Sequence, residues 1–258
     1  MDQTAVDAYL QRIACPRPIR PDAAALRQLH LAHLLAVPFE NLSIHLDEPI
    51  LLEPELLLAK IVTRRRGGFC FELNGLLAEL LLALGFRVRR LAAEVFGGDS
   101  YSPPFDHMML LVDLAEPWLV DVGFGASFRE PLRLVPDVVQ QDPEGAFRLV
   151  ETAGRWVMQE AVDGAWQPQC RFTTTGYELA DFKGRCQFHQ ESPNSHFRQS
   201  RMATLATPTG RITLSGRRFI TTNLNGERQE ELLPSEAACQ QKLAAAFGLT
   251  LESNATQS

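Results

Sequence analysis

The apolar residues of this chain change their spacing near residue 87, and this change limits the possible folds more than any other feature of the sequence. Before it, stripes such as Leu26, Leu29 and His33 recur at helical intervals, which predicts amphipathic helices. After it, short segments such as 88–96 and 107–114 have the composition of strands. Because a run of helices precedes a run of strands, the sequence predicts an α+β fold rather than a doubly wound sheet.

Helix boundaries follow from side chains that can satisfy the first N–H groups of a helix and from residues that interrupt it. Thr4 and Asp7 form a capping-box pattern, Asp22 and Ser235 can cap, and Pro54 suits a first helical turn. The predicted helices begin at Thr4, Asp22, Pro54, Cys70 and Ser235, and end near residues 13, 38, 66, 84 and 248.

Strand signals fill the middle of the chain. The predicted strands span residues 88–96, 107–114, 118–122, 147–152, 155–161 and 166–172, and two more hairpins turn at 208–210 and 225–226. Turn dipeptides such as Ala153-Gly154 predict antiparallel pairing. Residues 177–189 are predicted to be helical, and 252–258 to be disordered. The chain is thus expected to form a helical bundle, an antiparallel β region and a mixed α/β tail.

Charge and motifs exclude several classes of function. The net charge of -6 argues against a nucleic-acid partner. Neither G-x-G-x-x-G nor G-x-x-x-x-G-K occurs, so common nucleotide-binding folds lose support. The most apolar stretch, residues 76–86, is too short to span a bilayer, so we expect a buried helix and no membrane partner.

The five cysteines are scattered, odd in number and contain no C-x-x-C pair. This pattern argues against a disulfide framework and against a zinc site, so we expect no metal. It favours a reducing compartment, in which a single reactive thiol survives. The first residues carry no signal-peptide pattern, and we therefore expect a cytoplasmic protein.

Cys70 is the strongest candidate for chemistry. It follows Gly67-Gly68 at the predicted start of a helix, where the unpaired N–H groups stabilise an anion such as a thiolate. The glycines allow a sharp turn, and the Cys70 N–H is suited to an oxyanion hole. The alternative is that Cys70 is simply a small buried apolar residue.

His107 and Asp121 are candidates to complete a triad. His107 opens one predicted strand and Asp121 lies within a neighbouring one, so the imidazole and the carboxylate can meet. A buried carboxylate needs a partner, but a backbone turn or Arg133 are alternatives to His107. Cys, His and Asp in this chain order match the papain-type constellation in its transglutaminase-like arrangement.

Residues 66–74, 37–42, 121–125 and 192–197 form four segments that resemble sequences of the arylamine N-acetyltransferase family, in its prokaryotic form. Residues 66–74 read RGGFCFELN, like the family's R-G-G-x-C-x-E-x-N signature. Residues 37–42 resemble its P-F-E-N-L segment, and 121–125 match its D-V-G-F-G. Residues 192–197 resemble its later S-P-x-S-x-F segment. The matches keep the family's order and cover most of the chain.

The resemblance implies three units: a helical domain over residues 1–86, a β-barrel-like domain over 87–190 and an α/β lid over 191–258. It implies an acetyl-coenzyme A-dependent transferase that acts in xenobiotic metabolism. An acetyl-cysteine intermediate formed in ping-pong fashion would pass the acetyl group to arylamines, arylhydrazines or N-hydroxyarylamines.

The resemblance also implies roles for single residues. Cys70 would be the nucleophile, His107 the base and acid, and Asp121 the orienting group. The implied acceptor-binding residues are Phe39, Phe71, Phe124 and Phe197, and the implied coenzyme contacts are Phe124 and Gly125. Glu40 and Arg65 would form a structural ion pair near the site. Residues 126–129 depart from the family pattern, which affects the coenzyme contacts rather than the triad.

Three other functions share some of these features. A cysteine hydrolase, such as a peptidase or a transglutaminase-like enzyme, would use the same triad. An amide synthase of the same fold would take its acyl group from a carrier protein. A binding or regulatory protein would retain the site without the reaction. The sequence does not determine the oligomeric state.

Overall fold

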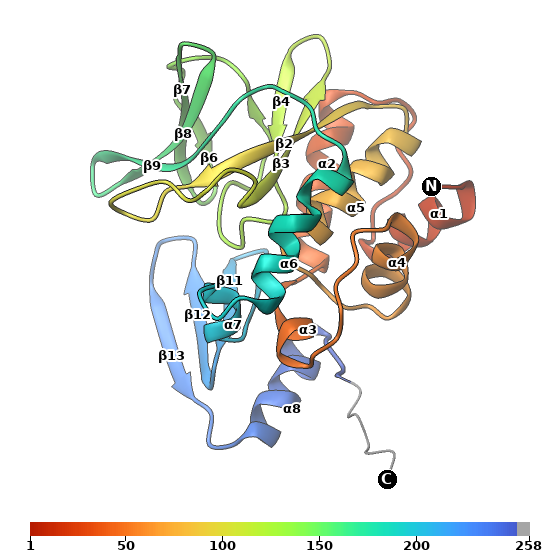
Figure 1. Ribbon diagram of the computed structural model, residues 1–258, viewed down its shortest axis with the longest axis vertical. Helices are drawn as coiled ribbons and strands as arrows, with labels where there is room; N and C mark the ends of the chain where they lie inside the picture. Colours follow the sequence, from red (N-terminus) through yellow and green to blue (C-terminus); the bar gives the residue numbers. More distant parts are fainter. Residues whose placement is uncertain (252–258) are drawn as a thin grey trace.

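The computed structural model describes residues 1–251, so the disorder predicted for 252–258 lies outside the described residues. Helices dominate the first third of the chain, and two antiparallel sheets follow (Figure 1). The helical elements are α1 Gln3–Arg12, α2 Ala23–Ala36, α3 Leu42–His45, α4 Pro54–Leu58, the π-helical turn η1 Ala59–Thr63, α5 Cys70–Ala83, the 3₁₀ turn η2 Leu179–Phe182, α6 Lys183–Glu191, α7 His196–Gln199 and α8 Glu236–Phe247. The predicted α+β class, with a helical bundle, a barrel-like sheet and an α/β lid, is confirmed.

The larger sheet has the order β5-β4-β3-β2-β9-β8-β7-β6. Its strands are β2 Arg87–Val95, β3 His107–Asp113, β4 Pro117–Val120, β5 Leu132–Arg133, β6 Gln140–Asp142, β7 Gly145–Thr152, β8 Arg155–Val162 and β9 Ala165–Phe172. The sheet curls so that its edge strands meet: the Gln140 side chain bonds both the N–H and the carbonyl of Arg133. This contact nearly closes a barrel.

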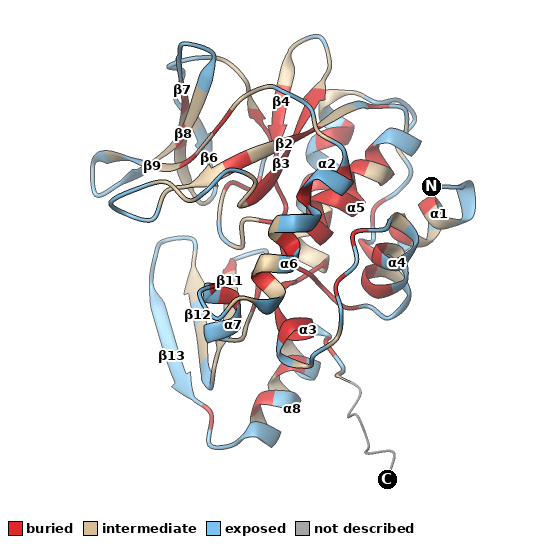
Figure 2. Cartoon of the chain, in the orientation of Figure 1, coloured by how far each residue is buried: buried red, intermediate tan, exposed pale blue. Residues whose placement is uncertain are grey.

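The two faces of β3 serve two cores. Met109 and Leu111 lie in the interior of the barrel, whereas Leu110 and Val112 join the core around α5. Strand residues alternate between faces, so His107 continues the barrel face of Met109 at the mouth of the barrel. Helix α5 is buried on most of its surface and lies between the barrel and the other helices (Figure 2).

The smaller sheet has the order β1-β10-β11-β12-β13 and packs against α8. Its strands are β1 Phe39–Glu40, β10 Met202–Thr207, β11 Gly210–Ser215, β12 Arg218–Asn223 and β13 Arg228–Leu232. Phe39 pairs with Thr204, so a segment of the helical third becomes an edge strand of the C-terminal sheet. The unit boundaries at residues 86 and 190 stay a prediction.

Several local predictions differ from the structure. Asp2 rather than Thr4 caps α1, because its carboxylate accepts the Ala5 N–H. The third helix does not continue to residue 66 but changes to a π turn after Leu58 and ends at Thr63. Neither β1 nor α3 was predicted, since two to four residues show no periodicity. The caps at Asp22 and Ser235 are confirmed.

No helix within residues 1–251 combines the length and the apolar character that crossing a bilayer requires.

Arg129 joins the barrel to the C-terminal sheet. Its side chain is almost fully buried and forms an ion pair with Glu144 at 2.7 Å. It also donates hydrogen bonds to the carbonyl oxygens of Thr207, at 2.6 Å, and of Gly210. These two carbonyls flank the turn between β10 and β11. One guanidinium therefore fixes the position of that hairpin relative to the barrel.

We expect Arg129→Met to lower the free energy of unfolding by about 3 kcal/mol, because it leaves buried carbonyls and a carboxylate without their donor. Urea denaturation measures this change. Arg133→Met is the matched control: Arg133 is partly exposed and lies 3.8 Å from Glu116, so its loss should cost less than about 1 kcal/mol. Equal losses in the two variants would contradict the anchoring role of Arg129.

Candidate active site

Cys70 is the first residue of α5, and Gly68, two residues before it, forms an isolated β-bridge with Phe39 of β1. A Cβ atom at Gly67 would lie 2.0 Å from the Pro38 carbonyl oxygen, so only glycine permits this approach. The first N–H groups of the helix have no intrahelical acceptor, and Glu72 Oε2 accepts the preceding N–H, of Phe69, at 3.1 Å. The thiol thus lies at a helix end whose partial positive charge favours an anion.

Two buried ion pairs hold the chain behind Cys70. Lys60 Nζ donates to Glu72 at 2.6 Å, and Arg66 Nη2 lies 2.8 Å from Glu40 Oε1. Burial would raise the pKa of Glu40, but the charges of Lys60 and Arg66 lower it. The predicted pairing of Glu40 with Arg65 is wrong: Arg65 is exposed at a turn with φ of 52°, and the next residue supplies the guanidinium.

His107 and Asp121 meet as an almost fully buried pair. His107 Nε2 lies 2.7 Å from Asp121 Oδ2, which leaves Nδ1 free on the other edge of the ring. Asp121 follows β4, which ends at Val120, rather than lying within a strand as predicted. The alternative partner, Arg133, lies instead beside Glu116. The remaining oxygen of Asp121 accepts the Gly123 N–H at 2.8 Å.

Asn74 connects this carboxylate to the helix that carries Cys70. It lies one turn after Cys70 on the same side of α5. Its Nδ2 donates to Asp121 Oδ1 at 2.8 Å and to the Met108 carbonyl at 2.7 Å, and its Oδ1 accepts the Val122 N–H at 3.0 Å. In the sequence, Asn74 stands out only as the last residue of the motif at 66–74. Its position four residues after Cys70 was the available signal.

Gly123 fixes the distance between the Asp121 loop and the start of α5. A Cβ atom at this position would lie 2.6 Å from Cys70 Cα and 2.8 Å from Asn74 Nδ2. Any larger residue would therefore push the loop away from the helix. The Gly in the D-V-G-F-G segment is required by this backbone-to-backbone contact.

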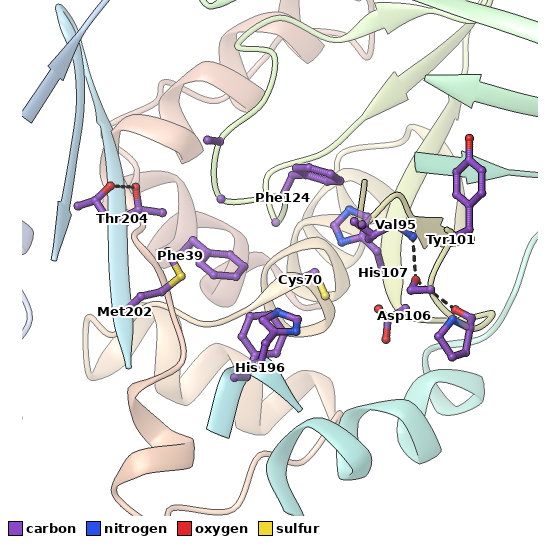
Figure 3. A pocket seen from close by; sticks show the side chains of 18 of the residues that line it. Phe39, Cys70, Val95, Tyr101, Asp106, His107, Phe124, His196, Met202 and Thr204 are labelled. Atoms are coloured by element: carbon purple, nitrogen blue, oxygen red, sulfur yellow. Dashed lines mark hydrogen bonds between the residues drawn. The ribbon is translucent and has the colours of Figure 1, made fainter. Parts of the chain in front are cut away.

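The charge of His107 depends on its neighbours. Burial acts to lower the pKa of His107, but the charge and hydrogen bond of Asp121, together with Cys70, raise it to about 10. Figure 3 shows the Cys70 sulfur close to the His107 ring. The imidazole therefore carries a proton at neutral pH and is placed to exchange it with a group bound at Cys70.

His30 supports the Asp121 loop from behind, and the sequence analysis gave it no role. Its Nε2 lies 3.0 Å from the Asp121 carbonyl oxygen, and its Nδ1 lies 2.8 Å from the Arg129 carbonyl oxygen. Burial lowers the pKa of His30, which favours its neutral form. Its partners lie about ninety residues away in the chain, so no local pattern could have revealed them.

A cavity of about 720 Å³ opens beside Cys70 and His107 (Figure 3). Phe39, Phe124 and Phe197 supply aromatic surface to it, and Gly125 lies in its wall. The cavity is also lined by residues that the sequence analysis did not single out, among them Val95, Tyr101, Asp106, Met202, Thr204 and Arg211. Its size suits a flat aromatic ring with room for a thioester beside it.

Phe71 does not line this cavity, although the resemblance implied an acceptor contact. It is fully buried and packs against Phe69 and Phe182, with ring centroids 5.2 and 5.6 Å away. Its helical neighbour Cys70 faces the cavity, and successive helix residues point about 100° apart. Phe71 therefore packs behind the cavity wall and does not contact the space where a ligand would bind.

The comparisons with known proteins agree with this geometry. A family model for N-acetyltransferases matches residues 22–256. A Salmonella typhimurium protein named arylamine N-acetyltransferase / N-hydroxyarylamine O-acetyltransferase is 36% identical, over 94% of this chain and 88% of its own length. This chain belongs to the arylamine N-acetyltransferase family. The resemblance in the four sequence segments is thereby confirmed.

Solved structures of arylamine N-acetyltransferases share the whole architecture. The enzyme from Salmonella typhimurium superposes with a TM-score of 0.92 at 35% identity, covering 96% of this chain and 92% of that chain. The Mycobacterium marinum enzyme in complex with CoA gives a TM-score of 0.88 at 36% identity, covering 94% and 92%. Acetyl-coenzyme A is the co-substrate of this family. Within residues 1–251, no three His, Cys, Asp or Glu side chains gather as a metal site requires.

We expect Asp121→Asn to lower the pKa of His107 below neutrality. Burial disfavours the imidazolium, and the variant lacks the negative charge that offsets this effect in wild type. The folded-state pKa of about 10 exceeds the ordinary 6.5, so the pair stabilises the fold fully below pH 6.5 and loses this contribution as the pH rises toward 10. A ¹⁵N NMR titration of His107 in both proteins measures the shift. A ring that titrates at the same pH in both would show that Asp121 does not set its charge.

Proposed function

We propose that Cys70, His107 and Asp121 carry out the acetyl transfer of this arylamine N-acetyltransferase. The observation that supports the assignment most is that Cys70 and His107 line one cavity and that Asp121 holds His107 from outside the cavity wall. Cys70 lies at the start of α5, and His107 is held by a buried carboxylate at 2.7 Å. This is the order of nucleophile, base and orienting group that a cysteine triad requires.

In the first half-reaction, the Cys70 sulfur attacks the thioester carbonyl carbon of acetyl-coenzyme A. Backbone N–H groups at the start of α5 face the developing oxyanion. The bond from the carbonyl carbon to the coenzyme sulfur then breaks, and the His107 imidazolium gives its proton to that sulfur. Coenzyme A leaves as a thiol, and the acetyl group remains on Cys70.

In the second half-reaction, the nitrogen of the acceptor attacks the acetyl carbon. The bond to the Cys70 sulfur breaks, and His107 takes the proton that the amine loses. Because the coenzyme must leave before the amine reacts, the kinetics are of the ping-pong type. Burial of His107 and Asp121 limits water near the thioester and so limits its hydrolysis.

The aromatic wall supports arylamines, arylhydrazines and N-hydroxyarylamines as acceptors, since Phe39, Phe124 and Phe197 can pack against a flat ring. The relative from Salmonella typhimurium bears both activities, N- and O-acetyltransfer, in its name. We assign Phe124 and Gly125 to contact with coenzyme A near the thioester. Both lie in the cavity wall directly after the Asp121 loop.

We also propose a cytoplasmic enzyme that acts without a nucleic-acid or membrane partner. The net charge of -6 supports the absence of a nucleic-acid partner, since a negatively charged protein does not attract polyanions. All five cysteines are free and buried, which fits a reducing compartment.

Intact-protein mass spectrometry tests the nucleophile. After incubation with acetyl-coenzyme A and no amine, wild type should gain one acetyl group, and an arylamine should remove it. Cys70→Ala should gain none. Cys15→Ala is the matched control, because Cys15 is another buried free thiol outside the cavity, and it should behave as wild type. An adduct on Cys70→Ala would assign the nucleophile to another residue, and an adduct that is lost to water equally fast with and without amine would indicate a hydrolase.

Phe39→Ala tests the aromatic wall. We expect about a tenfold rise in KM for aniline-type acceptors, because the ring loses an aromatic partner, with a smaller change for hydrazine, which has no ring. Steady-state kinetics with both acceptors measure the difference. A parallel rise in both KM values would mean that Phe39 acts through the β1–β10 pairing and not through contact with the ring.

A further inference from the structure

Asp106 has no part in the proposed acetyl transfer, yet its carboxylate lies in the wall of the same cavity. It immediately precedes His107 and lies in the cavity wall. Of the lining residues within 1–251, Asp106 alone carries a carboxylate, in a wall that is otherwise mainly aromatic, small or hydroxylated. Figure 3 shows its side chain near those of Cys70 and His107. An ionisable group in such a wall acts on whatever binds there.

A dedicated set of partners holds this carboxylate. Arg185 Nε donates to Asp106 Oδ1 at 2.6 Å, and His189 Nε2 lies 3.1 Å from the same oxygen. His189 is fixed in turn by Ser195, whose hydroxyl lies 3.0 Å from Nδ1. Every hydrogen bond and ion pair that Asp106 makes within the described chain uses Oδ1. Oδ2 is therefore the oxygen available to a ligand in the cavity.

The carboxylate keeps its charge in this position. Burial would raise the pKa of Asp106, but the hydrogen bonds and charges of His189 and Arg185 lower it well below the usual range. A ligand that enters the cavity at neutral pH thus meets an anion. Its partners approach from α6, which lies beside the loop before β3 (Figure 1).

Ser195, His189 and Asp106 have the composition of a hydrolase triad but not its accessibility. The Ser195 hydroxyl accepts the Phe197 N–H at 3.3 Å as the cap of α7, and the residue is 1% exposed. No acyl group can reach a hydroxyl in that position. The series therefore positions Asp106 and performs no second reaction.

The two sides of the cavity differ in the charged side chain that lines them. Figure 3 shows Phe39, Met202 and Thr204 on one side of Cys70, and Val95, Tyr101 and Asp106 on the other. Arg211, the one guanidinium among the described lining residues, belongs to β11 and thus to the first side. The phosphates of coenzyme A favour the side with the cation. A substituent on the acceptor ring can point to the side with Asp106 while the ring itself packs against the aromatic residues around Cys70.

We propose that Asp106 determines acceptor specificity. This role rests on the proposed acetyl transfer. Asp106 Oδ2 accepts a hydrogen bond from an N–H, O–H or cationic substituent on the acceptor ring, and it repels a carboxylate in that position. The favoured substrate class is thus arylamines with a hydrogen-bond donor or a positive charge opposite the reacting amine. Arylamines that carry an acid group in that place are disfavoured.

Three planar acceptors of nearly equal shape test this: 4-aminobenzamidine, which is cationic, 4-aminobenzamide, which is neutral, and 4-aminobenzoate, which is anionic. Wild type should show the highest kcat/KM ratio of amidine to benzoate. Asp106→Asn should reduce that ratio by at least about tenfold, the factor that a hydrogen bond to a charged group commonly contributes. The change in the ratio between proteins cancels the intrinsic reactivity of each amine.

Asp99→Asn is the matched control, because Asp99 is an exposed carboxylate in the same loop and lies outside the cavity wall. Its ratio should equal that of wild type. A merely structural role of Asp106 would lower all three kcat/KM values together and leave the ratio in place. That result, with an active Asp106→Asn protein, would overturn the proposal.

Arg185→Gln provides a second test if Asp106→Asn does not fold. Arg185 does not line the cavity, and its removal leaves Asp106 less neutralised. The amidine-to-benzoate ratio should then rise above that of wild type, and an unchanged or lower ratio would contradict the proposal. Failure of the proposed function is distinguishable, because wild type would then form no acetyl adduct in the absence of acceptor.

Discussion

The buried carboxylate of Asp121 is the constraint on which the rest of the site depends. A charge without access to water must be paired and fully hydrogen-bonded, and here His107, Asn74 and the Gly123 N–H meet that requirement. These groups come from β3, from α5 and from the loop after β4. The hydrogen bonds to this one carboxylate therefore fix the positions of three elements relative to one another. Cys70 lies beside His107 because it is on the same helix as Asn74, which binds Asp121.

Neighbouring residues at the start of β3 belong to two separate polar networks. His107 is held by Asp121, whereas Asp106 is held by His189 and Arg185. In the first network a histidine lines the cavity and a carboxylate supports it, whereas in the second a carboxylate lines the cavity and a histidine supports it. Asp106 lies in the bend just before β3 and His107 is the first residue of the strand, and both line the same cavity, so one strand end can serve a reaction and a binding preference together.

The parts of this enzyme that could be predicted from sequence are those with local causes. The start of α5 at Cys70 follows from the glycines before it, and the caps at Asp22 and Ser235 follow from short-range hydrogen bonds. The pairing of Glu40 was assigned to the wrong arginine, since the backbone turn at Arg65 has no sequence signature. His30 and Asp106 were missed as well, because their partners lie about ninety residues away for His30 and 79 or more for Asp106. Distances of that kind are set by packing and not by periodicity.

The short strand β1 has a consequence for the order in which the protein can be made. Phe39, which forms part of the cavity wall, pairs with Thr204, and the ribosome produces the second of these residues about 165 positions after the first. Until β10 has left the ribosome, β1 lacks its partner strand and the cavity lacks the residues that β10 and β11 contribute. A growing chain that already contains the whole triad is thus still without a closed site. The cavity beside Cys70 can therefore be complete only when more than three quarters of the 258 residues have been synthesised.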